Sequence, residues 1–169
     1  YINSVTTVLR KQHQDGKMTV QEIVVDRETF KKTKNDFRMV YGWSGDDDRT
    51  KWLEYEYRTR WSFKGGGKHE TEWTSAEANM IDLYAPYKRR VVRIFGDNHA
   101  LTEAGVRAVV VKVDYPFFEG RKSDKLTLRA DQPITDRTIE LTLPLDASEY
   151  HWDVTWIGGA GWKRTAQGT

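Results

Sequence analysis

The four histidines are the residues of this chain that could most readily serve acid–base or metal chemistry. They are His13, His69, His99 and His151, and no two of them stand at the spacing of metal-binding histidines. His69 and His151 fall in stretches whose pattern predicts strands beside glycine turns. We therefore expect structural, cross-strand roles for the histidines, and the sequence predicts no metal site.

A run of three carboxylates, Asp46, Asp47 and Asp48, follows Gly45. Clustered carboxylate oxygens can bind calcium, but loops of the EF-hand type alternate their ligands and carry a central glycine and a distal glutamate. This run lacks that pattern, and the second half of the chain has no counterpart of it. The pattern favours a solvated turn.

Motifs of catalysis are also missing. The chain has no cysteine, which excludes disulfides, thiolate catalysis and cysteine-ligated zinc or iron–sulfur clusters. It lacks the G-x-S-x-G nucleophile motif, the G-x-G-x-x-G fingerprint and the P-loop. A triad assembled in space from distant Ser, His and Asp residues is not visible from spacing alone. We predict no catalytic residues and no cofactor, with an enzyme of unknown class as an alternative.

Lys88, Arg89, Arg90 and Arg93 form a basic run interleaved with apolar residues. Basic and aromatic residues together can bind single-stranded nucleic acid, but the same pattern is typical of an edge strand protected by charge. The chain carries 27 Lys and Arg against 25 Asp and Glu, a net charge of +2. Because neither half is strongly charged, we expect an edge strand here and no nucleic-acid partner.

Apolar and polar residues alternate over most of the chain, which is the period of a β-strand. In residues 53–63, the clearest example, the odd positions are apolar or aromatic except for Thr59. Glycines at 65–67 follow and predict a hairpin whose loop is residues 64–66. That register pairs Arg60 with Glu70, Arg58 with Glu72 and Tyr57 with Trp73.

Further strands are predicted at residues 5–11, 19–26, 37–43, 80–84, 87–95, 107–115, 125–129, 138–143 and 150–157. Single helical turns are expected at 75–79 and 100–104. We see no signal peptide and no apolar run of membrane-spanning length. Many short strands separated by Gly, Pro, Asn and Asp predict an all-β protein, built as a sandwich or a barrel.

The chain contains an internal repeat. Tyr55-x-Tyr57-x-x-x-Trp61 recurs as Tyr150-x-Trp152-x-x-x-Trp156, and glycines follow both copies. Apolar stretches at 5–8, 23–25 and 37–41 precede the first copy, and stretches at 106–109, 126–128 and 139–143 precede the second. Shared order and spacing favour duplication over coincidence. We predict two tandem antiparallel β-sandwich modules, residues 1–85 and 86–169, related by internal duplication, with one larger sandwich as the alternative.

The aromatic strand with its glycine turn, at residues 55–67 and again at 150–161, resembles that of fibronectin type III and other immunoglobulin-like modules. It is similar in the same way to starch-binding modules, where an aromatic strand precedes a glycine turn. The resemblance covers a small part of the chain and implies a β-sandwich. Without a cysteine pair, the disulfide type of immunoglobulin domain is excluded.

Large apolar side chains in turns are the candidate contact residues: Trp43, Phe117, Phe118 and Trp162. Exposing such residues is costly unless a partner covers them, and capping of the sandwich ends is the alternative. We expect a non-catalytic structural or protein-binding module, part of an exported or surface-associated assembly in a periplasmic or extracellular location. A carbohydrate-binding module that uses exposed aromatics is the second hypothesis.

Overall fold

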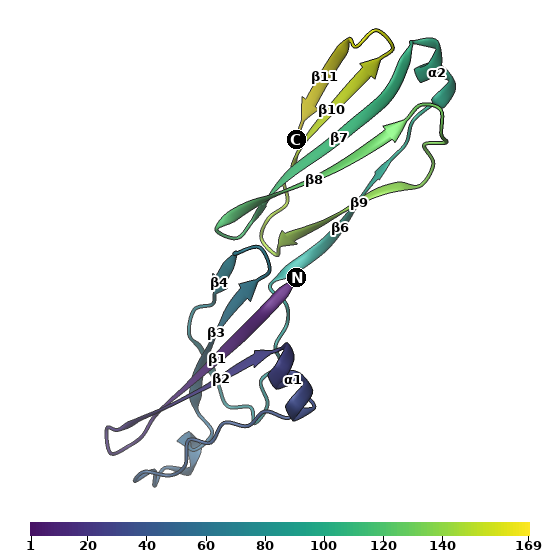
Figure 1. The fold of residues 1–169 in the computed structure, drawn as a ribbon. Helices are drawn as coiled ribbons and strands as arrows, with labels where there is room; N and C mark the ends of the chain where they lie inside the picture. The colour runs from purple at the N-terminus through teal and green to yellow at the C-terminus, as the bar shows by residue number, and fades with distance from the viewer. The chain divides into compact units, whose positions relative to one another are not determined.

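A computed structural model describes residues 1–169 and shows a mostly β protein built from antiparallel sheets. The all-β prediction is confirmed. The chain divides into two compact units, Tyr1–Tyr84 (unit 1) and Ala85–Thr169 (unit 2) (Figure 1). None of the helices combines the length and the apolar character that a membrane crossing requires.

Unit 1 is built on one five-stranded sheet in the order β2-β1-β3-β4, with β5 also paired to β3. Its elements are β1 (Ile2–Gln12), β2 (Met18–Asp26), α1 (Arg27–Thr33), the 3₁₀ helix η1 (Arg49–Lys51), β3 (Tyr55–Phe63), β4 (Lys68–Glu70) and β5 (Thr74–Ala76). Side chains alternate between the two faces of a strand. The odd positions of β1 and β3 face the core, where Val5, Leu9, Trp61 and Phe63 are buried.

The predicted hairpin forms, but its register changes part-way along. Arg60 pairs with Glu70 as expected, whereas Tyr57 pairs with Thr74 instead of Trp73. The Thr59 amide donates to the hydroxyl of Thr71 at 2.9 Å, so that a side chain interrupts the backbone ladder. The extra residue turns Trp73 to the opposite face, which makes the predicted pairs of Arg58 with Glu72 and of Tyr57 with Trp73 wrong.

Unit 2 has two sheets, a four-stranded sheet in the order β11-β10-β7-β8 and a two-stranded sheet of β6 and β9. Its elements are β6 (Tyr87–Ile94), α2 (Asn98–Glu103), β7 (Val106–Phe117), β8 (Gly120–Arg129), β9 (Arg137–Pro144), β10 (His151–Gly158) and β11 (Lys163–Gly168). Buried side chains of β7, among them Val111 and Val113, meet Leu141 and Leu143 of β9 in one cluster. The cluster therefore holds the two sheets of unit 2 together.

Three predicted elements are wrong. Residues 37–43 and 80–84 form no strand, and β5 stands where a helical turn was expected at 75–79. Residues 37–43 are held by side chains instead of a backbone ladder, since the Tyr41 hydroxyl donates to the carbonyl of Trp52 at 3.0 Å. Two elements, β11 and α1, were not predicted from the sequence. Asp26 is the N-cap of α1, and its side chain accepts hydrogen bonds from the amides of Glu28 and Thr29.

The two units share one strand order. In unit 1 a row of paired residues runs Val25, Val5, Trp61, His69 across β2-β1-β3-β4. In unit 2 a row runs Leu128, Val109, Trp156, Arg164 across β8-β7-β10-β11. Trp61 and Trp156 therefore occupy the same place, on the third strand of each row.

Candidate contact surface

The four predicted contact residues lie in three separate places. Trp43 belongs to unit 1, and its side chain is 68% exposed. Phe117 and Phe118 lie at the turn between β7 and β8, where Phe117 is buried and packs edge-on against Phe118, with ring centroids 4.9 Å apart. Trp162 lies in the turn between β10 and β11 and is exposed.

Within unit 2 the structure does not bring Phe117 and Phe118 together with Trp162. The β7–β8 turn and the β10–β11 turn lie at opposite ends of the four-stranded sheet, because β10 runs antiparallel to β7 (Figure 1). A flat aromatic platform made of Phe118 and Trp162 is therefore excluded within unit 2.

Trp162 is positioned by the glycine that ends β10. A Cβ atom placed on Gly158 would lie 1.9 Å from the indole ring, so the ring rests directly on the backbone of Gly158. The amide of Gly158 also donates to the carbonyl of Trp162 at 2.9 Å. The turn thus fixes a large apolar side chain that remains in contact with solvent.

Replacing Gly158 with Ala is expected to displace the Trp162 ring, because no alanine methyl group fits beneath it. The free energy of unfolding should fall by about 1–3 kcal/mol, as for overpacked sites. Chemical denaturation with tryptophan fluorescence measures both effects. Gly161→Ala is the control for backbone strain alone. Gly161 has a φ of +79°, but an added methyl group there would meet open space instead of a side chain. An unshifted Trp162 signal in Gly158→Ala would contradict the packing.

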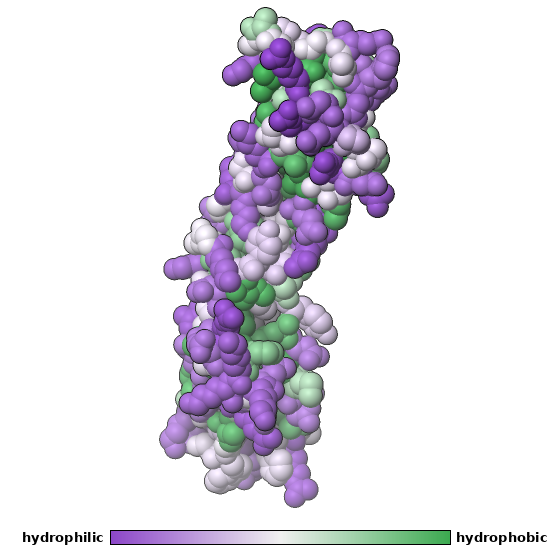
Figure 2. All heavy atoms as spheres, turned by 45° about the vertical axis from the view of Figure 1, so that its right-hand side comes forward, coloured by the Kyte–Doolittle hydropathy of each residue, from purple (hydrophilic) through white to green (hydrophobic).

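Residues 40–53 of unit 1, here called the tryptophan loop, carry several large apolar side chains that are exposed. Its large exposed residues are Val40, Trp43, Trp52 and Leu53. On the face that it presents, Figure 2 shows hydrophobic residues of the chain at the surface among hydrophilic ones. Sequence reasoning found only Trp43, since the Trp52–Leu53 pair reads as the start of the alternating strand that follows.

Asp46 organises the tryptophan loop from within. Its carboxylate accepts hydrogen bonds from the amides of Gln14 (3.0 Å) and Ser44 (3.2 Å) and lies 2.6 Å from Nδ1 of His13. Its backbone carbonyl accepts from the indoles of both Trp43 (3.0 Å) and Trp52 (2.5 Å). Asp46 is buried, so the prediction of a solvated turn is wrong at this residue.

A buried lysine supplies a second attachment for the loop. The Nζ of Lys11, on the core face of β1, donates to the carbonyls of Lys51 and Glu54 and lies 5.5 Å from the ring centroid of Tyr41. A buried ammonium group is stable only when its donors are satisfied. Lys11 thus attaches the C-terminal end of η1 to the sheet, and Asp46 attaches the residues that precede η1, so the exposed tryptophans project from an ordered base.

His13 completes a hydroxyl–imidazole–carboxylate chain. Its Nε2 atom lies 2.8 Å from Oγ1 of Thr19, and its Nδ1 atom lies 2.6 Å from the Asp46 carboxylate. This is the order of groups in a nucleophilic triad. The His13 side chain, however, is only 1% exposed, and both ring nitrogens are occupied by protein partners.

The carboxylates around the loop favour the ionised state. Hydrogen bonds lower the pKa of Asp46, chiefly through His13, and of Asp15, chiefly through Lys17 with help from Ser44. A hydrogen bond from Thr50 lowers the pKa of Asp48. These three carboxyl groups are therefore charged at neutral pH and attach the loop by accepting hydrogen bonds.

Acid is expected to loosen the tryptophan loop. Because the folded pKa values lie below the unfolded value of about 3.9, their contribution to stability is complete above that pH and is lost as the pH falls through the folded values. Urea denaturation followed by tryptophan fluorescence at pH 6 and at pH 2 should show a lower free energy of unfolding at pH 2. In Asp46→Asn part of this difference should be absent. Equal free energies of unfolding at the two pH values would exclude the effect.

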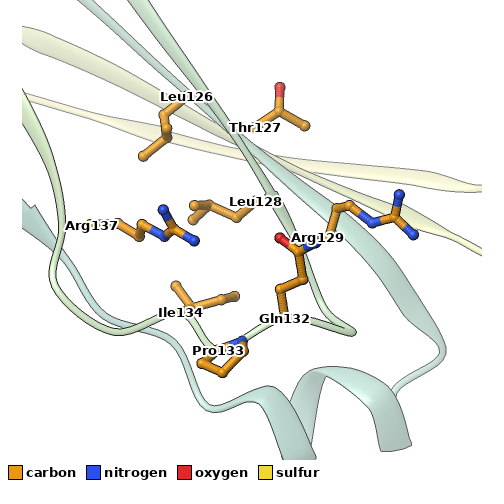
Figure 3. A pocket seen from close by; sticks show the side chains of 8 residues that line it. All are labelled: Leu126, Thr127, Leu128, Arg129, Gln132, Pro133, Ile134 and Arg137. Atoms are coloured by element: carbon orange, nitrogen blue, oxygen red, sulfur yellow. The ribbon is translucent and has the colours of Figure 1, made fainter.

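A cavity in unit 2 is too small for most ligands. It has a volume of about 160 Å³ and lies between β8 and the start of β9, where Leu126, Leu128 and Ile134 point inward with Arg137 beside them (Figure 3). Small-molecule sites usually measure 300–1,000 Å³. The structure also contains no group of three or more His, Asp or Glu side chains that could hold a metal ion.

Comparison with known proteins identified no relative of the chain. No protein-family model, no curated protein and no solved structure matches the chain.

Proposed function

We propose that the chain is a non-catalytic protein-binding module of an exported or surface-associated assembly, and that the tryptophan loop is its contact surface. The observation that carries the proposal is a loop whose large apolar side chains are exposed while its base is fixed by buried polar contacts. A preordered loop loses little conformational entropy when a partner binds. Exposed tryptophans of this kind are typical anchors of protein interfaces.

The composition of the loop favours a protein partner over a sugar. Val40 and Leu53, which flank the two tryptophans in the sequence, are exposed as well. Aliphatic side chains gain from burial against another apolar surface, whereas a sugar ring stacks on aromatic faces. Arg49, whose guanidinium lies 5.6 Å from the Trp52 ring centroid, adds a residue type that is enriched at protein interfaces.

Carbohydrate binding is the second candidate, because Trp43 and Trp52 are both exposed and both donate to one carbonyl oxygen. Two neighbouring indoles could stack on a saccharide. A glycan array with the wild-type chain and Trp52→Ala tests this candidate. Retention of one glycan class by the wild type alone would replace the protein-binding proposal.

We further infer that the chain formed by duplication of one immunoglobulin-like β-sandwich module. The common strand order of the two units and the matching rows through Trp61 and Trp156 support this inference. In unit 2 the sheet of β6 and β9 meets the four-stranded sheet in one buried cluster, which is the arrangement expected of the second layer of a sandwich. Unit 1 departs from the scheme, because residues 37–43, the counterpart of β9 in the repeat, form no strand.

The chain of Thr19, His13 and Asp46 serves in this proposal as a structural clamp. A catalytic histidine must exchange protons with a bound substrate, and the enclosed His13 has no free ring nitrogen. We expect nitrophenyl esters to be hydrolysed at the same rate by the wild type and by Thr19→Ala. A rate that falls at least about tenfold in Thr19→Ala would mark an active site and end the non-catalytic proposal.

The proposal is tested with variants that leave the clamp intact. Val40→Ser/Leu53→Ser changes exposed aliphatic side chains, which have no polar atoms to bond with Asp46 or Lys11. Partners crosslinked to the wild-type chain in extracts of its native source should be identified and then purified. Each should bind the wild type and bind Val40→Ser/Leu53→Ser at least about tenfold more weakly. The control, Val20→Ser/Val24→Ser, changes two exposed residues of β2 and should bind normally. Equal binding by all three proteins would refute the proposal.

A further inference from the structure

The four-stranded sheet of unit 2 is faced by only two strands. β9 lies against β7 and β8, and β6 pairs with β9 alone. On the inner face of the large sheet, Val109, Val111 and Val113 of β7 are buried. Their neighbours on β10, Trp152, Val154 and Trp156, are only partly buried. Arg164 of β11, which pairs with Trp156 of β10, is exposed. The small sheet of β6 and β9 therefore covers β10 and β11 less completely than it covers β7.

The contacts of β6 place its unpaired edge on this thinly covered side. Lys88 donates to the carbonyl of Leu145 at 2.9 Å, and Arg90 donates to the carbonyl of Ser148 at 3.1 Å. The guanidinium of Arg90 also lies 5.2 Å from the ring centroid of Tyr150. These partners belong to the segment that leads from β9 into β10, so β6 lies on the β10 side of β9. A strand added to β6 would extend over Trp152 and Trp156.

The outer face of β6 is basic and apolar at once. Arg89, Val91 and Arg93 of β6, followed by Phe95 just after the strand, alternate with Val92 and Ile94, which pack inward against the cluster. Val91 is 52% and Phe95 72% exposed. Neither Arg89 nor Arg93 forms a salt bridge. On the same face of β9 the only carboxylate is Glu140, opposite Val91.

We propose that an extended segment of a partner protein, with apolar residues alternating with Asp or Glu, binds by adding a strand to β6. Main-chain hydrogen bonds to the free edge supply affinity. Carboxylates on the outer side meet Arg89 and Arg93, while apolar residues on the inner side cover Trp152 and Trp156. Basic edge strands resist pairing with neutral or basic strands, so the same charges select an acidic partner.

This inference rests on the proposed protein-binding function and adds a second contact surface, β6, with a partner segment of stated composition. Its test uses a ten-residue peptide of alternating Val and Glu, titrated calorimetrically into the full chain. The peptide should bind, and hydrogen exchange should show new protection of amides in β6. Arg89→Glu/Arg93→Glu should bind at least about tenfold more weakly and should gain affinity for a Val–Lys peptide. The control Arg121→Glu/Lys125→Glu makes the same charge change on β8 and should alter affinity less than about twofold.

Three outcomes would overturn the inference: no binding of the Val–Glu peptide, equal weakening in the β8 control, or binding without protection of β6. Tighter binding of single-stranded DNA than of the peptide, lost in Arg89→Glu/Arg93→Glu, would assign the face to nucleic acid instead. The variant Val40→Ser/Leu53→Ser should bind the peptide normally, because its changes lie in unit 1. Failure of this inference is thereby separated from failure of the tryptophan-loop proposal.

Discussion

His13→Ala is expected to lower the free energy of unfolding by about 3 kcal/mol, the typical cost of breaking a buried hydrogen-bonded network. The imidazole connects the hydroxyl of Thr19 on β2 with the carboxylate of Asp46 in the tryptophan loop. Its loss leaves a cavity and removes a hydrogen-bonding partner of Asp46. Urea denaturation, followed by far-UV circular dichroism, measures the change. Fluorescence should report loosening of Trp43 and Trp52, whose indoles both bond to Asp46.

The matched control is Thr19→Val, which keeps the shape of the side chain and removes one hydrogen bond from His13. It should cost about 1 kcal/mol. If His13→Ala were no more destabilising than Thr19→Val, the link from His13 to Asp46 would contribute little, and the loop would owe its order to Lys11. The double variant His13→Ala/Thr19→Val should cost about as much as His13→Ala alone, because the two residues act in one network.

Alternation in the sequence was sufficient to find most strands. In residues 53–63 one face is apolar and the other charged, and a shift by one residue would bury the charges, so the pattern predicts both the strand and its inward side. The glycines at 65–67 also predicted the loop, since Gly65 and Gly66 adopt φ values of +94° and +96°. Local pattern and turn chemistry agree there.

Where side chains replace backbone pairing, the same reasoning fails. Residues 37–43 alternate like a strand, yet Tyr41 instead packs toward Tyr55, with ring centroids 6.1 Å apart. Likewise, the hydroxyl group of Thr71 accepts a hydrogen bond from the Thr59 amide where the hairpin register changes. Trp73 then packs against Arg10, whose guanidinium carbon lies 4.0 Å from the centroid of the Trp73 ring. Neither contact leaves a trace in residue spacing, because each depends on a tertiary partner.

The candidate site was only partly visible for a related reason. Trp43 stood out as a large apolar residue beside a glycine, but Asp46 resembled a surface carboxylate. Its partner His13 precedes it by 33 positions and approaches only through the fold of β1 and β2. A sequence signal did exist: Lys11 and His13 continue the core-facing odd positions of β1 after Val5 and Leu9. Polar residues at core positions predict buried polar contacts.

Leu141→Ala is expected to destabilise unit 2 by about 3 kcal/mol, within the range measured for buried leucines. Its side chain is 0% exposed and belongs to the cluster that joins β9 to the four-stranded sheet. The cavity cannot be filled easily, since Leu143 and Val113 beside it in the cluster are themselves fully enclosed. Because β6 pairs only with β9, loss of this contact weakens the whole second sheet.

Hydrogen exchange distinguishes this effect from general unfolding. Amides of β6 and β9 should lose protection first, ahead of those in β7 and β10, which keep their own backbone ladder. Val91→Ala, on the outer face of the same small sheet, should change stability by less than about 0.5 kcal/mol. If Leu141→Ala were as mild as Val91→Ala, the cluster would not be what binds the two sheets. A strand added at β6 would then lack the firm support that its proposed role requires.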